Sequence, residues 1–170
     1  ISKINMGLNI KNESNVDNSI HYWIPYNKGG ENKKWYGNHE YLVNWKNRGD
    51  NLTRNRSKNK HLWLQKGVNW GYISSSFFSA KFFDYGYFFD VSSSSAFPNE
   101  NDIKYITSFL NSSLSSLFLK IIAPTINFQV EDIQSLPIIF PKKESTKQQI
   151  DSLTQECIDI SKEEWDSRET

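Results

Sequence analysis

The spacing of apolar residues changes near Pro98, and this change divides the chain into two parts. In the first part, short runs rich in aromatic and β-branched residues alternate with turn residues such as glycine and aspartate, a pattern typical of β-strands. We therefore predict a curved, mainly antiparallel β-sheet before Pro98. Its expected strands cover residues 41–45, 62–65, 70–74, 80–83 and 87–91.

After Pro98 the apolar residues recur at intervals of three and four, which is typical of amphipathic helices. A helical region is expected over residues 103–121, with a break near 111–113. The break is expected because asparagine and serine side chains compete with the helical backbone for hydrogen bonds. Asn99 is a candidate for the cap at its start, and Pro124 limits its end.

The rest of the chain is expected to form an extended return over 125–130, a Leu-Pro connector at 136–141 and a last helix. Ser145, with Gln148 three residues later, has the capping-box pattern of a helix start. The apolar stripe of that helix, expected to be core, is Ile150, Leu153, Cys157 and Ile160. The pattern predicts an α+β fold with a β-rich part over 1–100, helical support with a return strand and connector over 101–141, and a C-terminal amphipathic helix over 142–170.

Charge is distributed unevenly along the chain. The formal net charge of the 170 residues is +1, but residues 21–81 carry eleven Lys and Arg against three Asp and Glu, a net of +8. Residues 131–170 carry five against ten, a net of −5. A basic surface attracts nucleic acid through the release of counterions, whereas an acidic one repels it. We expect the basic part to face a polyanion and the acidic part to face solvent or another protein.

The stretch 25–38 combines residue types that contact polyanions. Gly29 and Gly30 allow close approach to the backbone, lysines supply charge, and Trp35 and Tyr36 offer flat faces to a base or sugar. A solvated loop explains the same composition equally well. Four cations at even positions from 54 to 60 would share one side of an extended segment, although a mobile basic loop fits them as well.

The sequence lacks the motifs of common catalytic and metal sites. It contains no Gly-x-Gly-x-x-Gly and no Gly-Lys-Ser/Thr phosphate loop. His21, His39 and His61 do not have the spacing of zinc ligands, and Asp84 and Asp90 have no third partner that would make them a catalytic pair. From its residues alone, the chain is predicted to be a binding module with no catalytic residue, no metal site and no cofactor of its own.

No membrane partner is expected, because no apolar run reaches the roughly 18 residues that span a bilayer. The single cysteine, Cys157, permits no intrachain disulfide, which favours a reducing compartment. Cys157 is expected to be packed rather than catalytic. The chain opens on Ile1 rather than on methionine, and we expect it to be a soluble piece of a longer polypeptide.

Motifs in collinear order then become recognisable along nearly the whole chain. They are YNKGGE at 26–31, KWYGN at 34–38, VNW at 43–45, GVNW at 67–70, YISSS at 72–76, FDV at 89–91, FLNS at 109–112, PTINFQV at 124–130, DI at 132–133, LP at 136–137 and ISKEEWDS at 160–167. This order resembles the C-terminal target-recognition region of PglX-like DNA adenine methyltransferases of BREX phage-defence systems. The segment near 10–22 looks shorter than in that family, and 47–61 diverges from it.

The resemblance implies a bacterial, cytoplasmic parent enzyme that uses S-adenosylmethionine to methylate the exocyclic amino group of adenine in one DNA sequence. The parent's cofactor motif and Asn-Pro-Pro-Tyr catalytic motif are not in this chain. The chain would therefore read double-stranded DNA and hold it against the catalytic methyltransferase domain of the same polypeptide, which extrudes the adenine. The arrangement is similar to half of a type I restriction specificity subunit, with 142–170 as a spacer-like helix.

On this resemblance, the cations are expected to divide between phosphate contacts and base readout. Arginine is the better guanine reader because its fork bonds two acceptors, and amide side chains suit adenine. Serines at strand ends suit phosphate. The expected DNA-binding residues are Asn27, Lys28, Lys33, Lys34, Arg54, Asn55, Arg56, Lys58, Lys60, Ser75 and Lys81.

Two other functions fit the sequence less well. The chain could instead dock the methyltransferase onto other BREX proteins through its acidic helix. A nuclease domain is a third possibility, but the sequence has no Pro-Asp…Asp/Glu-x-Lys cluster. An exchange of residues 26–95 between relatives separates DNA reading from protein docking, because only the exchange of a DNA reader would change the methylated site.

Overall fold

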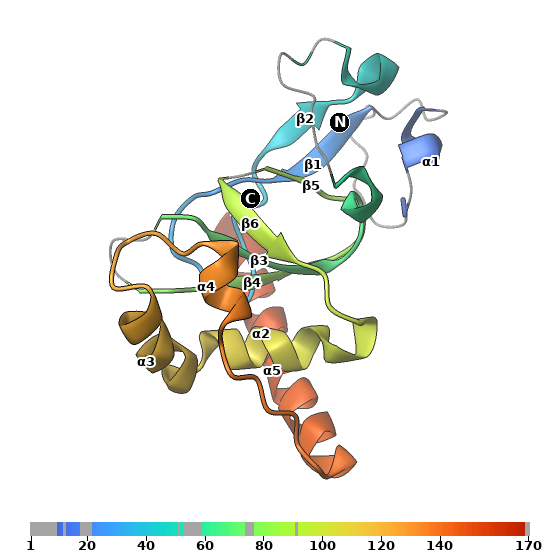
Figure 1. Ribbon diagram of the computed structural model, residues 1–170. Coiled ribbons are helices and arrows are strands. Elements are labelled where there is room, and N and C mark those ends of the chain that lie inside the picture. The colour runs from blue at the N-terminus through green and yellow to red at the C-terminus, as the bar shows by residue number, and fades with distance from the viewer. Residues whose placement is uncertain are drawn as a thin grey trace.

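The computed structural model of the chain (Figure 1) is mixed α and β, as the sequence predicts. It describes residues 10–11, 13–17, 22–50, 52, 59–73, 77–90 and 92–168. Within these residues the strands form two three-stranded sheets instead of the single curved sheet that we expected, and neither closes into a barrel. In the view of Figure 1 the first sheet lies at the top, the second in the middle, and most of the helices below.

The first sheet has the strand order β2–β1–β5. β1 (Trp23–Asn27) pairs antiparallel with β2 (Leu42–Asn44) and parallel with β5 (Phe88–Phe89). The parallel pairing sets Tyr26 opposite Phe88, so segments that are distant in sequence become neighbours. β2 confirms the strand expected over 41–45, whereas no strand was expected at β1, whose last residues belong to the stretch 25–38.

An aromatic cluster forms the core beside this sheet. The ring centroids of Trp45, Trp63 and Phe88 lie 4.6 to 5.2 Å apart, in tilted and edge-to-face arrangements. These are the arrangements that aromatic ring pairs favour. The short helix α1 (Glu13–Asp17) contributes Val16 to the same core.

The strand expected over 62–65 is wrong. Two short 3₁₀ turns, η1 (Lys46–Gly49) and η2 (Lys60–Leu62), lie in the region between β2 and the second sheet. Leu64, with φ of 66°, has a left-handed backbone that a strand cannot adopt. Its side chain is fully buried, and its N–H donates to the Tyr87 carbonyl at 3.1 Å. The apolar residues at 62–65 are therefore explained by the burial of a turn and not by a strand.

The second sheet has the strand order β4–β3–β6, and all its pairs are antiparallel. β4 (Ala80–Phe83) lies where the sequence predicts it, and β3 (Gly67–Gly71) begins three residues before the expected strand. β6 (Ser93–Ala96) was not expected, because serine has little preference for strands. It pairs along its whole length with β3, and this pairing outweighs the weak preference of its residues.

Two helices cover one face of the second sheet and its flank. η3 (Glu100–Asp102) leads into α2 (Ile103–Asn111), and α3 (Ser113–Ile122) follows. The expected break is confirmed at Ser112, whose side chain accepts a hydrogen bond from the Ser115 N–H at 3.1 Å. Asn99 precedes η3 but makes no side-chain cap bond.

Residues from strands and helices share the core of the second sheet. Val68 and Trp70 from β3 pack in one cluster with Ile103 and Leu110 from α2 and with Leu119 from α3. The expected division of the chain at residues 100 and 141 stays a prediction.

Helix α4 (Val130–Gln134) occupies the end of the segment that we expected to be extended. Its start is fixed by the N–H of Gln129, which donates to the Asp132 carboxylate at 2.9 Å. The extended conformation holds only before it, where Asn127 forms an isolated bridge with Ile73. A capping side chain therefore converts the end of this apolar segment into a helical turn.

The last helix, α5 (Glu144–Arg168), confirms the predicted element but not its buried stripe. Leu153 and Ile160 are 54% and 67% exposed, whereas Thr154 and Ile158 are buried. The helix packs against α2. The expected stripe is therefore wrong at Leu153 and Ile160, whereas Ile150 and Cys157 are half-buried.

Candidate nucleic-acid interface

The loop that follows β1 is fixed to the second sheet by its backbone. The Trp35 N–H donates to the Ala80 carbonyl at 3.0 Å, and the Phe82 N–H donates to the Trp35 carbonyl at 2.8 Å. Trp35 thereby forms a parallel bridge opposite Lys81. The same loop carries Lys28, which is exposed. Its cationic side chains are therefore displayed from an anchored backbone.

Lysines on the surface of the described residues lie over aromatic rings. Each ammonium is 4.4 to 5.7 Å from a ring centroid. Such contacts attract the cation to the electron-rich face of the ring and hold the long side chain in place. The pairs are Lys11 with Tyr85, Lys28 with Tyr41, Lys34 with Phe77, Lys46 with Tyr22, Lys60 with Trp63, and Lys66 with Tyr85.

Of the predicted DNA-binding residues, Lys28, Lys34 and Lys60 are exposed, and Lys33 is half-buried. Lys34 also donates to the Asn111 carbonyl at 3.2 Å, which ties it to the end of α2. Five predicted contacts lie outside the described residues, and they remain predictions. These are Arg54, Asn55, Arg56, Lys58 and Ser75.

Two predicted contacts are buried. Asn27 is 1% exposed and Lys81 is 3% exposed, so either could touch DNA only if the surface above it moved. Burial lowers the pKa of the Lys81 ammonium to about 8, and the nearby Glu40 carboxylate opposes this shift. Lys81 lies opposite Asn69 in the strand pairing, and strand alternation places both on the sheet face away from α2.

An aromatic cluster joins the anchored loop to the end of α5. The His39 ring lies 4.6 Å from Tyr36, 4.8 Å from Tyr87 and 6.4 Å from Trp165, measured between centroids. Both His39 nitrogens are buried without a hydrogen-bond partner among the described residues. Burial, with a smaller contribution from the charge of Lys81, lowers the pKa of His39 to about 3. The ring is therefore neutral at physiological pH.

Glycine is required where α5 meets this loop. A Cβ on Gly37 would lie 3.1 Å from the Trp165 ring, and the residue has φ of 127°. Trp165 thus packs against a position whose backbone conformation and lack of space favour glycine. No sequence pattern predicts this contact, because it brings together residues that are far apart in the chain.

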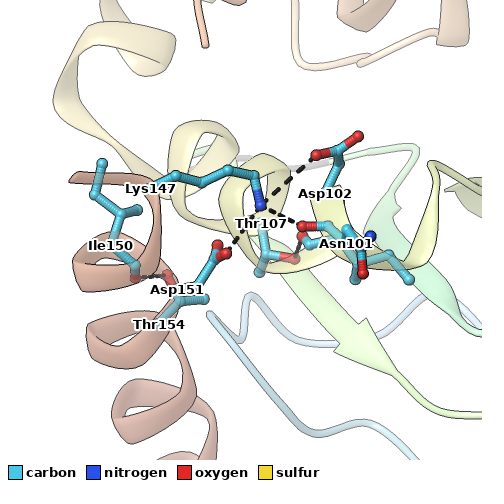
Figure 2. A network of polar contacts seen from close by, with 8 residues as sticks. Asn101, Asp102, Thr107, Lys147, Ile150, Asp151 and Thr154 are labelled. Atoms are coloured by element: carbon cyan, nitrogen blue, oxygen red, sulfur yellow. Dashed lines mark hydrogen bonds and ion pairs between the residues drawn. The ribbon is translucent and has the colours of Figure 1, made fainter. Parts of the chain in front are cut away.

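Polar contacts fix the other end of α5 to the start of α2 (Figure 2). The Lys147 ammonium lies 2.9 Å from the Asp151 carboxylate and 3.6 Å from that of Asp102, and it also donates to the Asn101 carbonyl. The hydrogen bond to Asp151 and the surrounding carboxylates raise the pKa of Lys147. α5 is therefore secured near both of its ends.

A groove of about 560 Å³ opens between the loop after β1 and the end of β3. Its lining is Lys28, Gly29, Gly30, Gly71, Tyr72, Ile73 and Ser92. The sequence indicated that Gly29 and Gly30 allow close approach, but it did not indicate which residues they would face. The missing information is the parallel pairing of β1 with β5, which brings Ser92 beside the loop.

Within the described residues, no group of three or more His, Cys, Asp or Glu side chains is arranged to hold a metal ion. In the same part of the chain, no helix combines the length and apolar character needed to cross a bilayer.

No family model matches the chain. It is 37% identical over 158 residues to the adenine-specific methyltransferase PglX of Lacticaseibacillus casei (strain Zhang), an alignment that covers 86% of this chain and 13% of that protein. It is 35% identical over 153 residues to the adenine-specific methyltransferase BrxX of Escherichia coli O9:H4 (strain HS), covering 87% of this chain and 12% of that protein.

The expected resemblance to PglX-like adenine methyltransferases is therefore confirmed along most of the chain, while its assignment to a C-terminal target-recognition region stays a prediction. The chain spans only about an eighth of the length of these relatives, 13% of one and 12% of the other. It is similar to one segment of the PglX and BrxX adenine-specific methyltransferases.

Proposed function

We propose that this chain is the double-stranded DNA target-recognition segment of a PglX-like, adenine-specific DNA methyltransferase of a bacterial phage-defence system. The similarity to two adenine-specific methyltransferases supports DNA as the partner. The observation that carries the recognition role is the set of surface lysines, each held over an aromatic ring. Cations next to flat rings suit a strand of alternating phosphates and bases.

In this proposal the chain supplies binding, and the remaining polypeptide supplies catalysis in the cytoplasm. S-adenosylmethionine, the methyl donor, would bind the catalytic domain of the same polypeptide. Lys28, Lys34 and Lys60 would contact phosphates, because lysine acts as a point charge. Base readout would fall to arginine and amide side chains, Arg54, Asn55 and Arg56 among them.

Fluorescence anisotropy with a mixed-sequence duplex, repeated at several salt concentrations, tests the binding role. The slope of log affinity against log salt counts the neutralised phosphates. Changing Lys28 or Lys60 to alanine is expected to lower that slope by about one each and to weaken all sequences alike. Lys120→Ala, an exposed lysine on α3, is the matched control and should leave the slope unchanged.

Exchange of residues 26–95 with the matching residues of a relative tests the reading role in a full-length methyltransferase. The methylated sequence should change to that of the donor. A hybrid that stays active at the original sequence would overturn target recognition by this chain.

A protein-docking role is the second candidate, and the exposed face of α3 favours it. Leu114, Leu117 and Ile121 are 51%, 56% and 71% exposed on this helix, while Ser115 is buried. Large apolar side chains gathered on one exposed helical face are typical of contact surfaces. If this role is the main one, Leu117→Ser should abolish assembly with a partner while duplex affinity stays unchanged.

A further inference from the structure

We propose that the groove between Lys28 and Ile73 holds one nucleotide unit of a DNA strand. The phosphate would lie at Lys28, and the sugar or base would lie against Tyr72 and Ile73. The inference rests on the proposed function and adds to it a binding site that the recognition role alone does not define.

The lining selects the class of ligand. Among the described residues of the lining, Lys28 is the one that carries a charge. The nearby Asp90 carboxylate accepts hydrogen bonds from Ser92, so the Lys28 ammonium supplies the attraction for an anion. Ile73 is 60% exposed and Tyr72 is half-buried, which provides an apolar and aromatic wall. A nucleotide combines an anionic group with a flat ring, and base stacking on aromatic side chains tolerates any sequence. The volume of about 560 Å³ lies within the roughly 300 to 1,000 Å³ of small-ligand sites.

Hydrogen bonds hold the walls of the groove in place. The Gly29 N–H donates to the Ser92 hydroxyl at 3.1 Å, and that hydroxyl donates to the Asp90 carboxylate at 2.5 Å. On the opposite wall, the Tyr72 carbonyl accepts from the Phe128 N–H at 2.8 Å. The groove is therefore formed before any ligand arrives, so less ordering is needed on binding.

The two glycines of the loop are needed for this construction. A Cβ on Gly29 would lie 2.5 Å from the Ser92 carbonyl oxygen, and one on Gly30 would lie 2.9 Å from the Asn38 amide nitrogen. Larger residues would push the loop away from the sheet. Gly71 differs, since a Cβ there meets only the Ile73 carbonyl oxygen, at an ordinary 3.4 Å.

An unpaired amide lies next to the groove in the chain. Asn27 precedes Lys28, and neither its donor nor its acceptor has a partner among the described residues. Unpaired buried polar groups are rare in native proteins and often mark a site that a ligand or water completes. The Asn27 side chain is 1% exposed and is not part of the groove lining, so the proposal rests on the lining and not on this amide.

Nuclear magnetic resonance of the backbone amides tests the site without a substitution. The amides of Gly29, Gly30 and Gly71 should shift when deoxyadenosine 5′-monophosphate is added. Inorganic phosphate at the same concentration should produce little change. Shifts with both ligands alike would reduce the groove to a simple anion site, and shifts with neither would overturn the proposal.

Substitutions then connect the groove to duplex binding. Tyr72→Leu, which keeps an apolar wall, should weaken binding of a mixed-sequence duplex roughly 5- to 150-fold, as expected for the loss of one stacking partner. Gly71→Val should block the groove with a similar loss, and Gly71→Ala should have a smaller effect. Ile139→Ser, at an isoleucine that is 78% exposed on the connector after α4, is the control.

The outcomes separate the two proposals. If the chain binds the duplex and every groove variant binds it as tightly as the original chain, the groove proposal is wrong and DNA binding stands. If the glycine amides respond to the mononucleotide but no duplex binds, the groove stands and the recognition role fails.

Discussion

The two sheets differ in how they treat buried polar groups. Around the helix-backed sheet β4–β3–β6, the Trp70 indole N–H donates to the Phe128 carbonyl at 3.1 Å, and the Asn111 amide bonds both backbone groups of Ala80. Around the sheet β2–β1–β5 and the loop after it, the Trp45 indole N–H and the whole Asn27 amide are buried without partners among the described residues.

The contrast is one of degree, because the helix-backed part also contains unpaired polar atoms. Asn69 and Asp151 each leave one oxygen unpaired while a second polar atom is bonded. The Ser115 hydroxyl, also in the helix-backed part, has no partner among the described residues. A buried polar group without a partner costs about 1 to 3 kcal/mol. The difference indicates that one region serves as a well-bonded support, while the region with the basic loop retains uncompensated groups of the kind found at functional sites.

The largest expected difference lies in a pair of tryptophans. Trp70→Phe should destabilise the fold by about 2 to 4 kcal/mol, because it leaves a cavity and an unpaired carbonyl. Trp45→Phe should cost clearly less, because it also removes an unpaired N–H. Urea unfolding of the two variants measures both values. Equal losses would contradict the comparison.

A pair of asparagines sharpens the contrast. Asn111→Leu should cost about 2 to 3 kcal/mol, since it deprives the Ala80 N–H of its hydrogen-bond partner and leaves the Ala80 carbonyl with only Trp35. Asn27→Leu should change stability little or increase it, because no hydrogen bond is lost. Thermal unfolding of both variants checks the prediction, and a loss at Asn27 as large as that at Asn111 would show that its amide is bonded in solution.

Acid should weaken the region around His39. Its pKa is about 6.5 unfolded and about 3 in the fold, so the unfolded chain takes up a proton first. Stability is fully present above pH 6.5 and is lost as the pH falls toward 3, by about 2 kcal/mol at pH 5. His39→Phe should remove this part of the pH dependence in unfolding curves recorded between pH 5 and 7.5. An unchanged slope would mean that the ring is accessible to protons in the fold.

The smallest effect is expected at the joint shown in Figure 2. Lys147→Met removes a cation whose side chain is 13% exposed and which lies between Asp102 and Asp151. The loss should be about 1 to 2 kcal/mol, because water can reach part of this site. Lys162→Met, at an exposed lysine of the same helix, is the control and should have almost no effect on denaturant unfolding.

Local patterns predicted the elements whose signal lies within a short stretch. Aromatic residues marked β4, and the side chain of Ser112 ended one helix and began the next. Elements held by distant partners were missed. β6 is a run of serines that pairs with β3, and the parallel neighbour of β1 is β5, which follows β3 and β4 in the sequence.

The candidate site was predictable in composition but not in arrangement. Exposed Lys28 and Lys60 follow from the charge pattern. The burial of Lys81 does not, because β3 and the loop that carries Trp35 must first come to lie on either side of β4. The groove depends on the hydrogen bond between Gly29 and Ser92, which are 63 positions apart in sequence. No local sequence pattern predicts such a contact.

The attachment of Trp35 and Asn111 to β4 has a consequence for self-association. Together they occupy the outward N–H and C=O groups of Ala80 and the N–H of Phe82. An open strand edge of this kind is a template on which another chain can add a strand and begin to aggregate. Trp35 of the basic loop and Asn111 cover these groups of the β4 edge, so another strand cannot pair with them. The exposed apolar residues of the chain are then not joined by an open β4 edge, at which another chain could add a strand.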